Sequence, residues 1–214
     1  MPMLASFFSR KGTAALMGKY YDRFMSGIEE KVLIRRRKQL FSGLQGKILE
    51  IGTGTGINLD LFPKKTTVVG FEPNPFMLSH AYERAAFIEN PNRFALYNLK
   101  TEDGTDILNE AAPFDALVFT LVLCTVAQPE SLVRSLLPYL REGAPILVLE
   151  HIIDPHPLIR WIQKTINPVW KRCAEGCHLT RSTDQMLEQI GLKATNASYF
   201  RAGLTFYQAV LYQT

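Results

Sequence analysis

Short apolar segments alternate with helix-like segments along most of this 214-residue chain, and this alternation limits the possible folds more than any other feature. Strands of a sheet covered on both faces are apolar throughout, whereas half-exposed strands alternate apolar and polar residues. The alternation therefore predicts an α/β fold with a mostly parallel sheet and helices on both faces. The expected strands are 47–52, 66–72, 93–99, 114–123 and 144–152, and the expected helices are 13–40, 56–62, 75–89 and 130–140, with Pro138 bending or shortening the last helix.

The pattern changes in the last third of the chain. The connection at 156–181 is too long for a plain link between two elements, so we expect 154–182 to contribute to a substrate pocket. A helix at 183–190 and strands at 192–200 and 204–212 follow, and the two strands suit an antiparallel hairpin at the sheet edge. The elements together predict a single domain with a Rossmann-like, seven-stranded, mostly parallel sheet and an antiparallel edge strand.

Positive charge gathers near the N-terminus. Residues 1–40 hold nine Lys/Arg and three Asp/Glu, a balance of +6, whereas the whole chain carries +4. The basic run at 35–38 suits a membrane surface or nucleic acid, but the solvated face of a helix is the simpler interpretation. We expect residues 1–42 to form a basic amphipathic helical segment, and we expect no nucleic-acid partner.

The apolar runs and the cysteines bear on location. The longest uncharged apolar run, 116–127, has twelve residues, which is too few for a helix to span about 30 Å of hydrocarbon. There are three cysteines, and residues 4–8 are too short for the apolar core of a signal peptide. An odd number of cysteines without such a signal predicts reduced thiols and a cytoplasmic protein.

Three glycines alternate in the stretch EIGTGTG at 50–56, directly after the first expected strand. A glycine-rich turn at this point of an α/β fold normally binds a nucleotide. The G-x-G-x-x-G dinucleotide pattern fails, because its third glycine would fall on Ile57 or on Leu59. The G-x-x-x-x-G-K-[ST] phosphate pattern fails too, because no lysine follows Gly54 or Gly56.

The acidic residue Glu50 stands just ahead of the glycines, where it would repel a pyrophosphate and suit a cationic ammonium or sulfonium. The stretch E-x-G-x-G-x-G resembles the glycine motif of class I S-adenosylmethionine-dependent methyltransferases of the type 11 domain. The resemblance implies S-adenosylmethionine as cofactor, with Glu72 at the end of the second strand accepting hydrogen bonds from the ribose hydroxyls. It also implies that Glu102 or Asp103, beyond the third strand, meets the adenine amino group. The remaining cofactor contacts that it implies come from Tyr21, Gly52, Thr53, Gly54, Gly56, Asn58, Pro73, Thr120 and Leu121.

Further segments, at 114–126, 147–152, 167–171 and 175–181, resemble the methyltransferase-like family 7 proteins, which are membrane-associated thiol S-methyltransferases. The likeness covers roughly residues 47–181. The long apolar N-terminal anchor that is common in that family is missing here, which leaves reversible peripheral contact through residues 1–40 as the membrane alternative. The stretch KYYDRF at 19–24 resembles the N-terminal helix of ubiquinone-pathway and phospholipid methyltransferases. In that resemblance Tyr20, Tyr21 and Asp22 form a lid over the cofactor, and the alternative is an ordinary amphipathic helix.

Several residues are candidates for the chemistry of methyl transfer. A thiol acceptor has a pKa near about 8.5, so modest help from a base suffices to remove its proton. The candidate bases are His151, which follows the fifth strand, and His178; each is alternatively a structural residue. The candidate substrate contacts are Tyr20, Cys124, Trp170 and Arg181. The C-x₃-C-H arrangement at 173–178 lacks a fourth ligand and has unusual spacing for zinc, so no metal is expected.

Three functions are consistent with these features. The first is S-adenosylmethionine-dependent methylation of a small lipophilic acceptor, with a thiol as first choice. The second is N-methylation of phosphatidylethanolamine at a membrane surface. The third is an inactive cofactor-binding or RNA-binding scaffold. The oligomeric state does not follow from the sequence.

Overall fold

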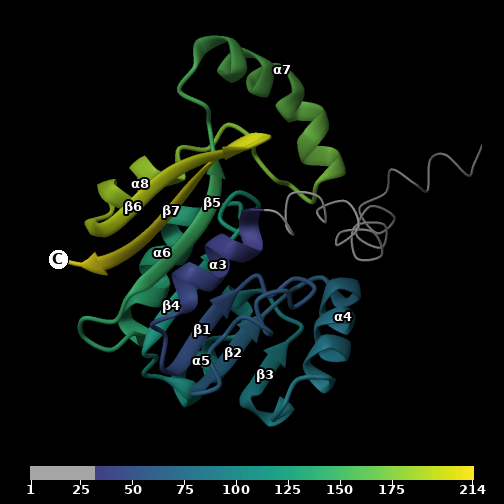
Figure 1. Cartoon of the computed structure of the whole chain (residues 1–214), viewed down its shortest axis with the longest axis vertical. Coiled ribbons are helices and arrows are strands. Elements are labelled where there is room, and N and C mark those ends of the chain that lie inside the picture. The colour runs from purple at the N-terminus through teal and green to yellow at the C-terminus, as the bar shows by residue number, and fades with distance from the viewer. Residues whose placement is uncertain (1–31) are drawn as a thin grey trace, which may run out of the picture.

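The computed structural model describes residues 32–214, which form a seven-stranded sheet in the order β3-β2-β1-β4-β5-β7-β6 (Figure 1). The strands are β1 (Gly46–Ile51), β2 (Thr66–Phe71), β3 (Phe94–Tyr97), β4 (Ala116–Thr120), β5 (Ile146–Ile152), β6 (Leu192–Ala202) and β7 (Leu204–Gln213). Strands β1 to β5 are parallel, and β7 runs antiparallel to both β5 and β6. The predicted fold class and the C-terminal hairpin are confirmed.

Helices cover both faces of the sheet. They are α3 (Ile34–Phe41), α4 (Pro75–Ala86), α5 (Thr105–Ala111), α6 (Pro129–Leu136), α7 (Pro157–Cys173) and α8 (Thr183–Gln189), with short 3₁₀ helices η2 (Pro91–Arg93), η3 (Thr101–Asp103) and η4 (Leu137–Tyr139). One hydrophobic cluster joins the sheet to α5, α6 and α8, and a second joins it to α3 and α4. Helix α7 stands apart, beyond the carboxyl end of β5 (Figure 1).

The two clusters explain why the central strands are apolar at most positions. In β1, Leu49 and Ile51 belong to the first cluster, whereas Ile48 belongs to the second. All residues of β4 and β5 are buried. Successive side chains of a strand point to opposite faces, so a doubly covered strand needs apolar residues at most positions.

Some predicted elements were wrong in detail. The expected helix at 56–62 is instead a series of turns, in which Leu59 N–H donates to the Gly56 carbonyl at 2.9 Å. Helix α5 was not predicted, because it is short and has polar residues at several positions. Strand β4 ends at Thr120, three residues earlier than expected, because Leu121 turns the chain with a positive φ of 56°. Pro138 ends α6 as predicted, since the 3₁₀ helix η4 takes over at Leu137.

The predicted helix at 13–40 falls mostly outside the described part of the chain. Within the described residues, α3 corresponds to its C-terminal end. The predicted lid residues Tyr20, Tyr21 and Asp22 also lie outside the described residues. Within residues 32–214, no helix combines the length and the hydropathy that crossing a bilayer requires.

Candidate functional site

The three glycines after β1 adopt left-handed backbone angles, and each meets a different environment. Gly52, Gly54 and Gly56 have φ values of 72°, 60° and 80°. A Cβ at Gly52 would lie 2.4 Å from Val122 Cγ2, and one at Gly56 would lie 2.9 Å from the Cα of Ala81. The nearest atom to a Cβ at Gly54 would be a carbonyl oxygen 3.9 Å away. Packing therefore requires glycine at two positions, whereas Gly54 leaves open space for a ligand.

A cavity of about 890 Å³ opens at the carboxyl ends of β1, β2, β4 and β5, which is where ligands bind in open α/β sheets. The glycine loop forms one side, and α7 supplies Ile166, Trp170 and Cys173 to the lining. Of the predicted cofactor residues that the structure describes, the cavity is lined by Gly52, Thr53, Gly54, Asn58, Glu72, Pro73, Glu102, Thr120 and Leu121. Glu50, Gly56 and Asp103 do not line it.

Glu72 places a buried carboxylate at the cavity wall. Its Oε2 accepts a hydrogen bond from Gly54 N–H at 3.0 Å, and its Oε1 accepts one from Asn74 N–H at 2.8 Å. Burial raises the pKa of Glu72 to about 7, although both hydrogen bonds oppose the shift. An ionised carboxylate keeps free lone pairs after two such bonds, so Glu72 can still accept hydrogen bonds from a ligand's hydroxyl groups.

Glu50 lies behind the glycine loop rather than on the cavity surface. It is fully buried, and its Oε1 accepts a hydrogen bond from Asn58 Nδ2 at 2.5 Å. Arg37 Nη1 in turn donates to Asn58 Oδ1 at 2.5 Å and to Thr120 Oγ1 at 2.8 Å. Burial raises the pKa of Glu50 to about 7, while Asn58 and the Arg37 charge oppose the shift. Glu50 therefore orients two cavity-lining side chains, Asn58 and Arg37.

The burial of Arg37 was not predicted, because the basic run was interpreted as a solvated helix face. Arg35 and Lys38 are exposed, but Arg37 is only 4% exposed. It lies four residues from both Leu33 and Phe41, which are fully buried on the same helix face. That spacing was a signal in the sequence that could have identified Arg37 as an inward-facing residue.

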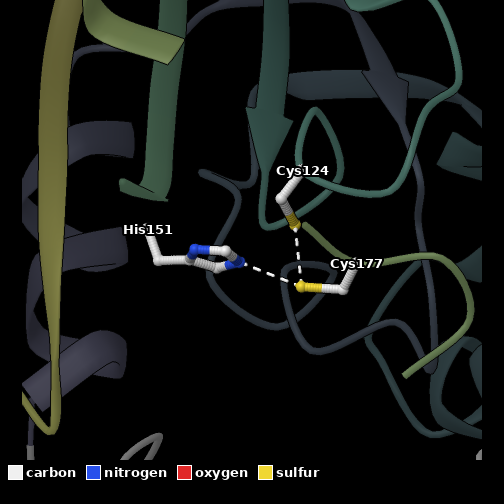
Figure 2. Close-up of side chains that lie close together, drawn as sticks. All are labelled: Cys124, His151 and Cys177. Atoms are coloured by element: carbon white, nitrogen blue, oxygen red, sulfur yellow. Dashed lines mark hydrogen bonds between the residues drawn. The ribbon is translucent and has the colours of Figure 1, made fainter. Parts of the chain in front are cut away.

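The other side of the cavity contains two cysteines and a histidine that meet in space (Figure 2). His151 Nε2 lies 3.0 Å from Cys177 Sγ, which lies 3.7 Å from Cys124 Sγ. All three side chains are buried and line the cavity. Hydrogen bonding to Cys124 and to His151 lowers the pKa of Cys177 to about 4, against the effect of burial. We call these three residues the sulfur–imidazole cluster.

Hydrogen bonds to the backbone hold the cluster in place. The buried Glu150 carboxylate accepts from the N–H groups of Val122 and Leu123 at 2.8 Å each, which fixes the turn that carries Cys124. His178 N–H donates to the Cys124 carbonyl at 2.9 Å, and the Arg181 guanidinium donates to the Leu123 carbonyl. These bonds dock the segment that carries Cys177 onto the turn after β4.

The candidate residues on the acceptor side therefore divide into two groups. His151, Cys124 and Trp170 line the cavity, as their predicted roles require, whereas His178 and Arg181 do not. The Arg181 guanidinium bond gives that residue a structural task, and the backbone N–H of His178 also helps to hold the turn after β4. Glu175 was missed; it lines the cavity, and Asn74 Nδ2 donates to its carboxylate at 2.7 Å. No periodicity or motif marked Glu175 in the sequence.

Comparison with known proteins assigns the family. A methyltransferase domain family matches residues 21–197, which is most of the chain. The chain belongs to this methyltransferase family. Similar curated proteins include the human thiol S-methyltransferase TMT1B, which is 32% identical over 165 residues, or 72% of this chain and 66% of that protein. The human thiol S-methyltransferase TMT1A is 27% identical over 190 residues, or 84% of this chain and 76% of that protein.

Solved structures support the fold of this methyltransferase. An O-methyltransferase family protein from Burkholderia thailandensis superposes with a TM-score of 0.73 at 10% identity, covering 97% of this chain and 64% of that one. The plantazolicin methyltransferase BpumL, solved in complex with SAH, gives a TM-score of 0.61 at 12% identity. The superposition covers 98% of this chain and 93% of the BpumL chain.

S-adenosylmethionine is the cofactor of this methyltransferase, as the sequence predicted. The described residues fit it, because the open space at Gly54 lies beside a buried carboxylate, Glu72, that has spare acceptor capacity. The contact between Glu72 and the ribose hydroxyls stays a prediction from the sequence. Glu102 lines the cavity and Asp103 does not, so Glu102 is the better placed of the two for adenine.

Proposed function

We propose that this methyltransferase methylates the sulfur of a small lipophilic thiol. The observation that carries the proposal is the single cavity that runs from the glycine loop to the sulfur–imidazole cluster. Between these two ends the lining is largely apolar, with contributions from Val122, Val126 and Leu132. Two relatives with similar sequences are named thiol S-methyltransferases.

The cavity supports transfer mainly by positioning its contents. When bound, S-adenosylmethionine supplies an electrophilic methyl group on a sulfonium. Glu72 would hold the ribose at one end of the cavity, and the acceptor would occupy the half that contains the cluster. Apolar walls orient a lipophilic acceptor and exclude water, and holding two reactants in line removes a large part of the entropic barrier. His151, the predicted base, lies on this wall and can receive the thiol proton.

A screen of acceptors with isotopically labelled S-adenosylmethionine tests the proposal. The full chain is incubated with alkanethiols, amines, phenols and phosphatidylethanolamine vesicles, and labelled products are separated and counted. We expect transfer to alkanethiols that increases with chain length until the cavity is filled. The Gly54→Arg variant serves as the inactive control. Transfer to amines or phenols without transfer to thiols would refute the thiol assignment.

A second candidate is N-methylation of phosphatidylethanolamine. A phosphatidylethanolamine N-methyltransferase from Cereibacter sphaeroides is 27% identical over 114 residues, or 53% of this chain and 55% of that protein. Helix α7 also exposes Leu158, Ile162 and Val169, and its sequence contains four basic and no acidic residues. Such a helix suits the surface of an anionic membrane.

The vesicle arm of the screen distinguishes the two candidates. Labelled phosphatidylethanolamine, together with co-sedimentation of the protein with anionic vesicles, would favour the second. Labelled thiol without labelled lipid would favour the first. Co-sedimentation with labelled thiol alone would mean that a thiol methyltransferase associates with the membrane surface, through α7 or through residues 1–40, where the sequence predicted peripheral contact.

A further inference from the structure

The sulfur–imidazole cluster has the dimensions of a metal site. Cys124 Sγ, His151 Nε2 and Cys177 Sγ lie within 4.8 Å of one another, and this is the one such group of three found in residues 32–214. Tetrahedral Zn²⁺, with Zn–S bonds of about 2.3 Å and a Zn–N bond of about 2.0 Å, separates two sulfur ligands by ~3.8 Å and a sulfur from a nitrogen by ~3.5 Å. The observed separations are 3.7 Å between the sulfurs and 3.0 Å between His151 and Cys177. Small side-chain movements are enough to admit the ion.

The cluster has one open direction. Its three side chains approach from β5, from the turn after β4 and from the segment after α7, and all three line the cavity. The cavity side is therefore open to a fourth ligand. Two cysteines, one histidine and an open position form the arrangement of a catalytic zinc site, whereas a structural site is closed by a fourth protein ligand.

The surroundings favour a thiophilic ion and preserve the geometry without one. Two thiolates and a neutral imidazole balance the charge of a divalent ion, and sulfur ligands select zinc over magnesium or calcium. The nearby Glu150 carboxylate accepts from two backbone N–H groups through one oxygen, Oε1, which ties it to the ligand-bearing turn, while its Oε2 has no hydrogen-bond partner among the described residues. The same bonds, with that of His178 to the Cys124 carbonyl, hold the ligand-bearing turn in place.

We propose that Cys124, His151 and Cys177 bind Zn²⁺ and that the sulfur of the acceptor thiol occupies the fourth position. The identity of this fourth ligand depends on the proposed function, but the metal site does not. On binding, the thiol loses its proton to water at the cavity mouth. Its sulfur then forms the new S–CH₃ bond as the CH₃–S⁺ bond of the cofactor breaks, and the electron pair of that bond remains on the cofactor sulfur. His151 acts here as a ligand, and the metal takes the place of a base.

Metal content provides a test that does not require activity. The full chain is purified under reducing conditions without chelator, and its zinc is measured by mass spectrometry. We expect about one Zn²⁺ per chain. Replacing the zinc with Co²⁺ should give a thiolate-to-cobalt charge-transfer band in the near ultraviolet. Substoichiometric zinc, together with the absence of this band on Co²⁺ titration, would overturn the site.

Variants assign the ligands. Cys124→Ser, Cys177→Ser and His151→Gln should each weaken metal binding by at least about 10-fold. Cys173→Ser is the matched control, because Cys173 is exposed and lies outside the cluster, and it should retain the metal. Binding of S-adenosylmethionine and the thermal unfolding temperature show whether each variant is folded. Metal loss in folded variants of the cluster supports the site, whereas retention of metal in all three overturns it.

The alternatives give different results. If the two buried cysteines form a disulfide, mass spectrometry of the unreduced protein will show a loss of two hydrogens and no metal. If His151 acts as a metal-free base, thiol methylation will persist in chelator-treated, metal-free protein. This outcome would refute the role of the metal in the transfer, whereas the disulfide would overturn the site itself; the proposed function stands in both cases. The opposite result is also possible: the protein binds one metal ion per chain, but it methylates no thiol, and an alkanethiol does not change the charge-transfer band of the Co²⁺ form. That result would refute the proposed function and leave the metal site intact.

Discussion

The two halves of the cavity are built in different ways. The cofactor half consists of the glycine loop and Glu72, which end two neighbouring strands, and Gly54 N–H donates directly to that carboxylate. The acceptor half brings together Cys124 and Cys177, which are 53 residues apart. One half is the product of a short motif and parallel strand ends, whereas the other exists only after the segment following α7 has docked on the turn after β4.

The halves also differ in chemistry. The cofactor half presents one buried carboxylate, Glu72, which suits a ligand with hydroxyl groups, and Glu50 lies behind it without lining the cavity. The acceptor half has sulfur, imidazole and apolar side chains, which suit a soft and lipophilic partner. Substitutions in one half should therefore change the affinity for the cofactor, and substitutions in the other should change the handling of the acceptor.

The largest expected effect is that of Gly54→Arg. The side chain would point into the open part of the cavity, and its charge would repel a sulfonium, so the Kd for S-adenosylmethionine should rise at least about 100-fold, or about 3 kcal/mol. Isothermal titration calorimetry measures this. Gly143→Arg is the control, because Gly143 also has a positive φ, 72°, and no atom within 4 Å of its Cβ position, but lies away from the cavity. Equal losses in both variants would point to backbone strain.

The pH dependence of stability reports on the buried carboxylates. Because the folded pKa of Glu50 is about 7 and its ordinary value is 4.5, the folded state binds more protons between these pH values. The free energy of unfolding should therefore fall as pH rises from about 5 to about 7, by on the order of 1 kcal/mol per pH unit from this group.

Urea unfolding at several pH values checks this expectation. Glu50→Gln keeps an acceptor for Asn58 and should have a flatter pH profile than the native chain, whereas Glu142→Gln at an exposed position should leave the profile unchanged. Parallel profiles for Glu50→Gln and the native chain would show that Glu50 titrates normally.

Trp170→Ala tests whether the acceptor half acts independently. Removal of this ring enlarges the lipophilic end of the cavity, so the KM for an alkanethiol should rise about 10-fold while the Kd for S-adenosylmethionine stays the same. Steady-state kinetics and calorimetry give the two values. Trp161→Ala is the control, since Trp161 lies on the same helix, is 65% exposed and does not line the cavity. A large change in cofactor affinity for Trp170→Ala would contradict the division into halves.

The smallest expected effect separates Glu102 from Asp103. Glu102 lines the cavity, and its loss should remove one hydrogen bond to adenine, which is worth about 1 kcal/mol or a several-fold increase in Kd. Asp103→Ala should leave the Kd unchanged, because Asp103 lies in the same 3₁₀ helix but does not line the cavity. A larger increase in Kd for Asp103→Ala than for the Glu102 variant would instead assign the adenine contact to Asp103.

Local pattern was a good guide to the elements whose environment is uniform. The strands buried on both faces were found because most positions along them are apolar. The end of α6 was found because Pro138 cannot continue a helix. The turns at 56–62 were mistaken for a helix, because their apolar residues have helical spacing while Gly56, at a φ of 80°, starts a different path. The burial of Arg37 was missed, because a run of like charges suggests a solvent-exposed helix face. Which of those charged residues is buried depends on the side of the helix that packs against the sheet.

The sequence by itself determined the parallel sheet and the identity of the cofactor, because each depends on residues close together in the chain or on the pattern of adjacent strands. The acids expected to contact the cofactor stay predictions. Only the tertiary structure decided which candidates on the acceptor side meet. His151 and Cys177 become neighbours, while the Arg181 guanidinium donates to the Leu123 carbonyl and His178 does not line the cavity. The reason is physical. Contacts between residues that are dozens of positions apart in the sequence depend on how whole segments pack, and local periodicity does not predict that packing.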